Sequence, residues 1–222
     1  MKAVVIGATG GIGAALAEAL EAEGANVTRL GRRTTPALDL LDEASIAAAA
    51  AAIGPGLHLV IDATGFLHDA RFSPEKSLRQ IDPAHMTHSF AINATGPALL
   101  MKHFLPLLAR DERAVFATLS ARVGSIGDNK IGGWTSYRAA KAALNQIMRN
   151  ASIELARTHR GAICVSLHPG TVATPLSGPF AKAGLEIQAP AQSAERLLAV
   201  IAALTPADTG GFFDHKGEPI PF

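Results

Sequence analysis

The N-terminal segment places a buried strand, a glycine-rich turn and a helix in direct succession, and this order constrains the fold more than any other part of the sequence. Residues 3–6 are a short apolar run, typical of a strand buried on both faces. Residues 7–13 read Gly-Ala-Thr-Gly-Gly-Ile-Gly, and residues 14–23 have helical periodicity. Glycines allow a tight turn and the close approach of a ligand, and a helix N-terminus offers free N–H groups to a pyrophosphate. The segment predicts a phosphate-binding loop.

The glycines of this turn fit two spacings. Gly7, Gly11 and Gly13 match Gly-x-x-x-Gly-x-Gly, whereas Gly7, Gly10 and Gly13 match Gly-x-x-Gly-x-x-Gly. Glycine turns also join strands and helices that bind nothing, so the surrounding strand and helix give the motif its weight.

A basic pair follows the second predicted strand. Residues 26–30 predict that strand, and Gly31, Arg32 and Arg33 come directly after it. In a dinucleotide-binding fold this point meets the adenosine ribose, where an acidic residue binds the 2′-hydroxyl of NAD and an arginine accommodates the 2′-phosphate of NADP. No acidic residue stands there, so the pair favours NADP(H) over NAD(H). The alternative is a basic turn that contacts only solvent.

Strands and helices alternate along the rest of the chain. The predicted later strands are residues 37–40, 57–61, 113–119, 162–167 and, at a sheet edge, 210–214. The predicted later helices are an Ala-rich segment capped by Asp42, residues 83–110 with interruptions at Pro97 and Pro106, residues 134–159 and residues 191–204. This alternation predicts an α/β doubly wound parallel sheet, a Rossmann fold, in one domain over residues 1–222. Residues 176–189 are punctuated by Gly and Pro and predict a substrate flap.

The only tyrosine of the chain, Tyr137, precedes Lys141 by one helical turn. Residues four apart on a helix share a face, so the phenol and the ammonium project into the same space. A nearby positive charge favours the phenolate, so we expect Lys141 to lower the pKa of Tyr137 and to make it a usable acid or base. The alternative is an exposed helix on which the two residues coincide. Asn93 stands among small apolar residues and is expected to be hydrogen-bonded in the interior or functional.

Composition narrows the class of protein. Hydrophobic residues make up 48% and charged residues 18% of the chain, which argues against disorder. A formal net charge of +1 gives no electrostatic reason to expect a nucleic-acid or membrane partner. No stretch approaches ~20 uninterrupted apolar residues, and the N-terminal apolar run is too short for a signal peptide. The single cysteine, Cys164, suits a small core residue in a reducing cytoplasm. No metal-ligand cluster is predicted.

Together these segments resemble the short-chain dehydrogenase/reductase family along the whole chain. Its glycine motif matches Gly7, Gly11 and Gly13, and Asp62-Ala63-Thr64-Gly65 stands where the family has Asn-Asn-Ala-Gly. The remaining matches are Asp39 for the adenine-contacting aspartate, Asn93, Tyr137 and Lys141 for catalytic residues, and Pro169-Gly170 with Thr174 for the segment at the nicotinamide. Gly124-Ser125-Ile126, Gly132-Gly133 and the Phe-Phe-Asp ending are similar to the small C-factor and carbonyl reductase-like group.

The resemblance implies hydride transfer between NADP(H) and a carbonyl or alcohol substrate, with Tyr137 as general acid/base. It also implies that Lys141 binds the nicotinamide ribose and that Asn93 holds a water linking Lys141 to solvent. The implied cofactor-binding residues are Gly7, Thr9, Gly10, Gly11, Ile12, Gly13, Arg32, Arg33, Asp39, Leu40, Ala63, Thr64, Gly65, Asn93, Tyr137, Lys141, Pro169, Gly170, Val172 and Thr174.

The chain departs from the family at the catalytic serine. The family places that serine three residues before a glycine, and here Ala121 precedes Gly124 by three. Ser120 is one residue earlier and, on a strand, would point to the opposite face. A local twist would let Ser120 serve, Ser125 could reach in from the loop, or Tyr137 and a water could hold the substrate oxygen instead. We favour Ser120.

Two other function classes remain open. Ala121 supports a dinucleotide-binding sensor or signalling protein with little or no turnover. A nucleotide-sugar epimerase fits the ambiguous glycine spacing, but the chain lacks the length for a C-terminal substrate domain. We also expect a homodimer or homotetramer that pairs through residues 83–110 and 134–159, with Ala139, Ala143 and Met148 at the contact. Candidate pocket residues are Phe180, Leu185 and Ile187.

Overall fold

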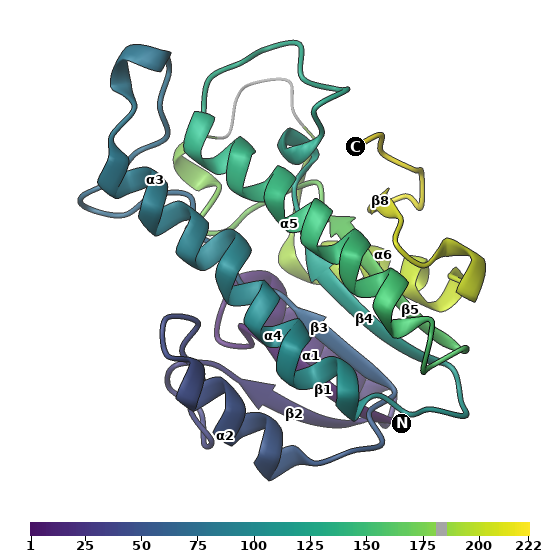
Figure 1. The fold of residues 1–222 in the computed structure, drawn as a ribbon. Helices are drawn as coiled ribbons and strands as arrows, with labels where there is room; N and C mark the ends of the chain where they lie inside the picture. The colour runs from purple at the N-terminus through teal and green to yellow at the C-terminus, as the bar shows by residue number, and fades with distance from the viewer. Residues whose placement is uncertain (181–185) are drawn as a thin grey trace.

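A computed structural model describes residues 1–180 and 186–222, and its centre is a parallel sheet (Figure 1). The strands lie in the order β2-β1-β3-β4-β5-β8, so the order reverses beside β1. Their bounds are Lys2–Ile6 for β1, Asn26–Leu30 for β2, Leu59–Asp62 for β3, Ala114–Leu119 for β4, Ala162–His168 for β5 and Phe212–Asp214 for β8. Two further short strands, β6 (Thr171–Val172) and β7 (Ile187–Gln188), pair with each other outside this sheet. The predicted doubly wound parallel sheet is confirmed.

Helices cover both faces of the sheet (Figure 1). α1 (Gly11–Ala22) and α6 (Pro190–Ala203) pack on one face, and α2 (Glu43–Ile53), α4 (Gly96–Phe104) and α5 (Thr135–Leu155) pack on the other. α3 (Pro83–Phe90) leads into α4. Short 3-10 turns lie at Leu78–Gln80, Leu105–Leu107, Arg122–Gly124, Gly178–Phe180 and Pro206–Asp208.

Each face of the sheet has its own apolar core. Along β4, Phe116 faces the helices α4 and α5, whereas Val115 and Ala117 face α1 and α6. This alternation follows from the two-residue period of a strand. Because both faces are covered, every residue of β4 is buried, as the apolar sequence predicts. Cys164 is fully buried in the first of these cores, which confirms its prediction as a core residue.

The predicted strand at residues 37–40 is wrong. Only one isolated bridge forms there, between Gly31 and Ala37. Side chains near the segment take up its backbone groups: the N–H of Asp39 donates to the hydroxyl of Ser45, and the carboxylate of Asp39 accepts from the N–H of Leu41. The segment is therefore a loop at the edge of the sheet next to β2. The predicted strand at 57–61 begins later, at Leu59, and the predicted edge strand at the C-terminus is confirmed as β8.

The predicted helix at residues 83–110 is continuous as far as Phe104 but changes its winding at Asn93. Between α3 and α4 lies a π-helical turn, Ala91–Thr95. In a regular α-helix the carbonyl of Asn93 would accept from the N–H of residue 97, but Pro97 has no N–H. The wider turn is the expected response to this lost donor, and such turns often lie at functional sites.

The described part of the chain includes no helix that combines the length and the apolar character needed to cross a membrane.

Candidate functional site

The candidate site lies where parallel strands end beside one another, at the carboxyl edge of β1, β3, β4 and β5. Ligands of open parallel sheets bind outside this edge, near the point at which the strand order reverses. The predicted glycine turn, the Asp62–Gly65 segment, Ser120 and the Pro169–Thr174 segment all follow these strand ends.

The glycine turn is too tight for side chains. Gly7 has a φ of 81°, and a Cβ there would lie 2.9 Å from the carbonyl oxygen of Ala63. A Cβ at Gly13 would lie 2.3 Å from the carbonyl oxygen of Gly7. α1 begins at Gly11, and Gly10 at its N-cap has no side chain to cap it. The first N–H groups of α1 therefore remain available to an anion, as a phosphate-binding turn requires.

The segment after β5 lies against this turn. A Cβ at Gly11 would lie 2.9 Å from Cγ2 of Thr174. The hydroxyl of Ser193 donates to the carbonyl oxygen of Pro169 at 3.2 Å, which ties the segment to α6. Gly170 has a φ of 78° and leaves no room for a side chain beside Gln188 and His215. Of the other residues predicted here, Val172 is buried in β6 and Ile12 packs at the edge of the α1–α6 core.

The arginine pair stands next to the glycine turn. Arg32 and Arg33 are exposed directly after β2. A Cβ at Gly31 would lie 3.5 Å from Oγ1 of Thr9. The glycine turn and the segment with the arginine pair are therefore in contact. Leu40 and Asp39 are half-buried in the following loop, and the Leu40 side chain packs against Gly96.

Asn93, Lys141 and Gly65 meet at the end of β3. A Cβ at Gly65 would lie 3.6 Å from Oδ1 of Asn93 and 4.0 Å from Nζ of Lys141. Asn93 is fully buried; it accepts from the N–H of Phe66 at 2.9 Å and donates to the carbonyl oxygen of Phe66 at 2.8 Å. Of the two alternatives predicted for Asn93, hydrogen bonding in the interior is observed, and its functional role stays a prediction. Nζ of Lys141 donates to the carbonyl oxygen of Leu119 at 2.8 Å.

Tyr137 and Lys141 lie on one face of α5, as their spacing predicts. Nζ of Lys141 lies 5.9 Å from the centroid of the Tyr137 ring. Both side chains are buried, at 8% and 2% exposure. Burial raises the pKa of Tyr137, which is the opposite of the direction expected from the charge of Lys141. Burial also lowers the pKa of Lys141 to about 8, although the negative charge of Asp62 acts to raise it.

Asp62 is a buried carboxylate that sequence reasoning treated only as a departure from a motif. Its Oδ2 accepts from the hydroxyl of Thr118 at 2.7 Å, and its Oδ1 accepts from the N–H and the hydroxyl of Thr64. These bonds join the ends of β3 and β4 and shape the turn that includes Ala63. A single acidic residue in an apolar strand was the signal available in the sequence.

The serine candidates differ in their surroundings. Ser120 is 4% exposed, and its hydroxyl has no hydrogen-bond partner among the described residues. Ser125 is 1% exposed, and its hydroxyl accepts from the N–H of Asp128, which fixes it in its own loop. Ala121 is half-buried and extended, with a φ of −146°. Ser120 is therefore the serine with an uncommitted hydroxyl.

A chain of aromatic rings begins at Tyr137. The ring of Trp134 lies edge-on to Tyr137 at 6.3 Å and to Phe180 at 5.3 Å between centroids, and His68 packs on Phe180 at 5.1 Å. This places the predicted pocket residue Phe180 near the site. Ile187 is 48% exposed on β7, and Leu185 lies outside the described residues, as does part of the predicted flap at 176–189.

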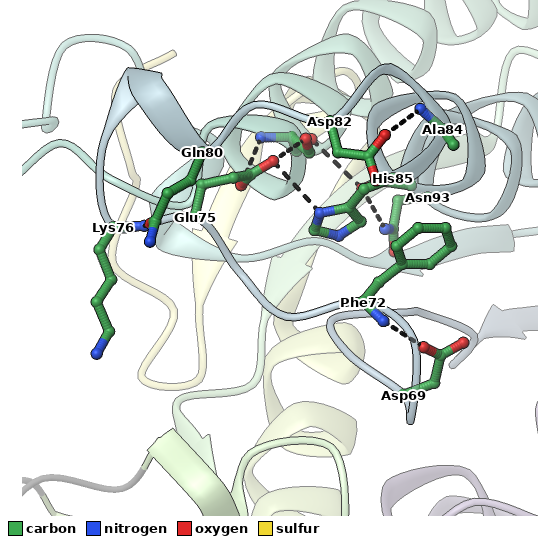
Figure 2. A network of polar contacts seen from close by, with 11 residues as sticks. Asp69, Phe72, Glu75, Lys76, Gln80, Asp82, Ala84, His85 and Asn93 are labelled. Atoms are coloured by element: carbon green, nitrogen blue, oxygen red, sulfur yellow. Dashed lines mark hydrogen bonds and ion pairs between the residues drawn. The ribbon is translucent and has the colours of Figure 1, made fainter.

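Sequence reasoning missed the residues that hold the start of α5. Glu75, His85 and Ser136 form a buried polar cluster beside Tyr137, and Figure 2 shows Glu75 and His85 pointing toward each other. No local pattern marks Glu75, because its partners lie far away in the sequence. In the described part of the chain, no group of three or more side chains is arranged to hold a metal ion.

Comparisons with known proteins identify relatives of this chain. A family model described as enoyl-(acyl carrier protein) reductase matches residues 7–204. C-signal of Myxococcus xanthus is 38% identical over 146 residues, which cover 66% of this chain and 84% of C-signal. The 1-hydroxy-2-glutathionyl-2-methyl-3-butene dehydrogenase of a Rhodococcus species is 34% identical over 195 residues, 87% of this chain and 82% of that enzyme.

Solved structures give the same picture of the fold. The NADPH-bound carbonyl reductase from chicken fatty liver is similar with a TM-score of 0.85 and 27% identity, over 100% of this chain and 98% of that one. Carbonyl reductase Sniffer of D. melanogaster has a TM-score of 0.84 at 23% identity, over 100% of this chain and 99% of its own, which supports the fold alone.

Proposed function

The chain belongs to the short-chain dehydrogenase/reductase family of oxidoreductases, and from this premise we propose that it is an NADP(H)-dependent carbonyl reductase or alcohol dehydrogenase. The observation that carries the proposal is the meeting of Tyr137, Lys141 and Asn93 next to Gly65, at the sheet edge that also carries the glycine turn. A dinucleotide fits the donor set, because the turn leaves backbone space at Gly7 and Gly13 and open N–H groups at α1.

In this proposal Tyr137 is the proton donor. Burial raises its pKa, so the phenol keeps its proton at neutral pH and gives it up to the oxygen of a carbonyl substrate only with the help of a neighbouring positive charge. Nicotinamide chemistry supplies the hydride when the cofactor is bound. Lys141, tied to Leu119, stabilises the negative charge that Tyr137 acquires when it gives up its proton. The reverse reaction would use the ionised form of Tyr137 as base.

The remaining residues position these groups. The two hydrogen bonds between the Asn93 side chain and the backbone of Phe66 fix the turn after β3, and Asn93 itself lies in the π-helical turn. Ser120 is the residue that we propose as hydrogen-bond donor to the developing oxyanion, because its hydroxyl is uncommitted. Arg32 and Arg33 are the proposed partners of the 2′-phosphate, which makes NADP(H) the preferred cofactor.

A screen of aldehydes and ketones tests this function. Each compound is mixed with the protein and NADPH, and the consumption of NADPH is compared with the amount of alcohol formed. We expect at least one compound for which the amount of alcohol formed equals the amount of NADPH consumed. NADPH binding without any turnover across the panel would contradict the proposal.

A second function has one observation in its favour. Ala121 removes the hydroxyl that the family uses at that place, and the similarity to C-signal allows a role as a dinucleotide-binding sensor or signalling protein. The same screen separates the two functions, because a sensor binds NADPH with little or no turnover.

We also propose a cytoplasmic location and a homodimer or homotetramer. The single, buried Cys164 suits a reducing compartment. The predicted contact needs one correction: Met148 is 1% exposed in the core between α5 and the sheet, so it is not available to a partner. The partly buried side chains that line a groove along α4 and α5 are better candidates, among them Leu105 and Ile147. Light scattering at micromolar concentration tests this, and a monomer mass would contradict it.

A further inference from the structure

The helix that carries Tyr137 and Lys141 begins without a cap of its own. Its N-cap residue is Trp134, which has no side-chain hydrogen bond to the helix, and its first turn has no acidic residue. Trp134 is left-handed, with a φ of 52°, a conformation that a bulky residue rarely adopts. Among the described residues it is the one non-glycine residue with a positive φ. Such a conformation persists only where the surrounding structure fixes it.

Glu75 supplies the missing cap from a distant loop. Its Oε2 accepts from the N–H of Ser136 at 3.2 Å, and its Oε1 accepts from the hydroxyl of Ser136. The backbone carbonyl of Glu75 accepts from the N–H of Trp134. Glu75 therefore accepts hydrogen bonds from two backbone N–H groups at the start of α5, those of Trp134 and Ser136. Glu75 lies 61 residues before Ser136 in the sequence. A carboxylate is also favoured by the positive end of the helix dipole.

The loop that carries Glu75 is itself fixed. Glu75 is 2% exposed, and its Oε1 lies 3.4 Å from Nδ1 of His85 on α3, which is 4% exposed. Gly133 leaves the space into which the Glu75 backbone fits, because a Cβ there would lie 3.3 Å from the Glu75 carbonyl oxygen. In Figure 2 the Glu75 carboxylate points toward the His85 ring, and the Phe72 ring lies on the other side of His85. That ring stacks on His85 at 5.0 Å between centroids.

The cluster also reaches Asn93. The hydroxyl of Ser89 donates to the carbonyl oxygen of Ser136, and the amide nitrogen of Asn93 donates to the Ser89 hydroxyl at 3.2 Å. Glu75 and Asn93 thus hold the two sides of one buried network, with Ser136 between them.

We propose that Glu75 is a positioning residue for Tyr137. By capping α5 at Ser136 and holding Trp134 left-handed, it fixes the rotation of the first helical turn, on which Tyr137 is the next residue after Ser136. It also sets the edge-on packing of Trp134 against Tyr137. The inference rests on the proposed function for its kinetic consequence, but its structural consequence can be measured without turnover.

Two substitutions of Glu75 separate the effect of its side-chain length from the effect of its charge. Glu75→Gln keeps the length of the side chain and removes its charge; its amide oxygen can accept from the Ser136 N–H, and its NH2 group can donate to the Ser136 hydroxyl. Glu75→Asp keeps the charge but is one methylene shorter, so it cannot make the same contacts with Ser136. Glu75→Ala removes both. Asp42→Ala is the matched control, because it removes a carboxylate cap from α2, where Asp42 accepts from the N–H of Ala44 at 3.0 Å.

The kinetic readout is kcat against the KM for NADPH, at a temperature at which every variant is folded. We expect Glu75→Ala and Glu75→Asp to lower kcat roughly 10- to 100-fold, as a small displacement of a reacting group does. The KM for NADPH should stay within about twofold, since the glycine turn and the arginine pair, which would bind its phosphates, lie outside α5. Glu75→Gln should restore kcat to within about threefold of the wild-type value. Asp42→Ala should lower the melting temperature and leave kcat unchanged.

The spectroscopic readout is the emission of Trp134, the only tryptophan of the chain. We expect a shift to longer wavelength in the Ala and Asp variants and none in Gln or in Asp42→Ala. Wild-type emission and kcat in folded Glu75→Asp would overturn the inference, as would equal loss in the Asp and Gln variants. If Glu75→Ala does not fold, the comparison of Glu75→Asp with Glu75→Gln decides whether Glu75 positions Tyr137. A wild-type protein without turnover contradicts the proposed function alone, and the emission of Trp134 then still decides the role of Glu75.

Discussion

Nζ of Lys141 donates a hydrogen bond to the carbonyl oxygen of Leu119 at 2.8 Å, which ties the ammonium on α5 to the last residue of β4. This bond holds a buried charge at the end of a strand, one helical turn from Tyr137. Burial lowers the pKa of Lys141 to about 8, and the charge of Asp62 opposes that shift only in part.

The stability of the protein should therefore depend on pH through Lys141. Its pKa of about 8 lies below the ordinary value of 10.5, so between these pH values the unfolded chain binds more protons than the folded one. Stability then rises with pH across this window. Relative to Lys141→Met, the free energy of unfolding of the wild type should increase by on the order of 2 kcal/mol between pH 7 and pH 10.

Urea denaturation of both proteins at each pH measures this difference. Lys141→Met is the control for the wild type, because the two proteins share every titrating group except Lys141. If the difference in the free energy of unfolding between the two proteins stays constant with pH, the pKa of Lys141 is not lowered by folding.

The second prediction concerns the cofactor. Arg32→Ala should weaken NADPH binding at least about tenfold, since losing one charge-assisted contact to a phosphate costs about 1.5–3 kcal/mol. NADH binding should stay nearly unchanged, because NADH has no 2′-phosphate. Titration of both cofactors by fluorescence checks this, with Arg33→Ala as the neighbouring variant. Equal losses for NADPH and NADH would refute the assignment.

The third prediction concerns the oxyanion. Ser120→Ala should lower kcat by roughly 10²–10³, the loss typical of one oxyanion donor. Ala121→Ser should then change kcat little. Ser125→Ala should be nearly silent, because the bond that its hydroxyl accepts from the N–H of Asp128 holds the Ser125 side chain in its own loop. If Ser120→Ala keeps normal kcat and Ala121→Ser raises it, no serine replaces the usual one.

The fourth prediction concerns Asn93. Asn93→Ala leaves the N–H and the carbonyl of Phe66 without their buried partners, at a cost of about 1–3 kcal/mol each. We expect the free energy of unfolding to fall by on the order of 2–6 kcal/mol in chemical denaturation. Asn93→Asp keeps one acceptor but sets its second carboxylate oxygen against the carbonyl oxygen of Phe66, so it should not restore the stability lost in Asn93→Ala. Stability within about 0.5 kcal/mol of the wild type would mean that other groups replace Asn93 at Phe66.

The sequence predicted the parts of the site that depend on local periodicity. Tyr137 and Lys141 share a face because helical spacing places them so, and the glycine turn follows β1 because the strand and the helix are both strongly patterned. The strand predicted at 37–40 failed because the Ser45 hydroxyl bonds the N–H and the carbonyl oxygen of Asp39, which a strand would use for pairing.

Burial and distant contacts could not be predicted in the same way. The charge of Lys141 suggested a lowered pKa for Tyr137, but the packing around α5 desolvates the phenol and raises it. The cap of α5 comes from Glu75, whose position beside Ser136 depends on how the loop after β3 folds, not on any pattern near Glu75.

The most direct test of the proposed function compares the wild type with Tyr137→Phe, using a carbonyl compound that the wild type reduces. Removing one hydroxyl should abolish the proton donor, with kcat falling by at least roughly 10²-fold, while the Kd for NADPH stays within about twofold. Wild-type turnover in Tyr137→Phe would contradict the proposed reductase chemistry.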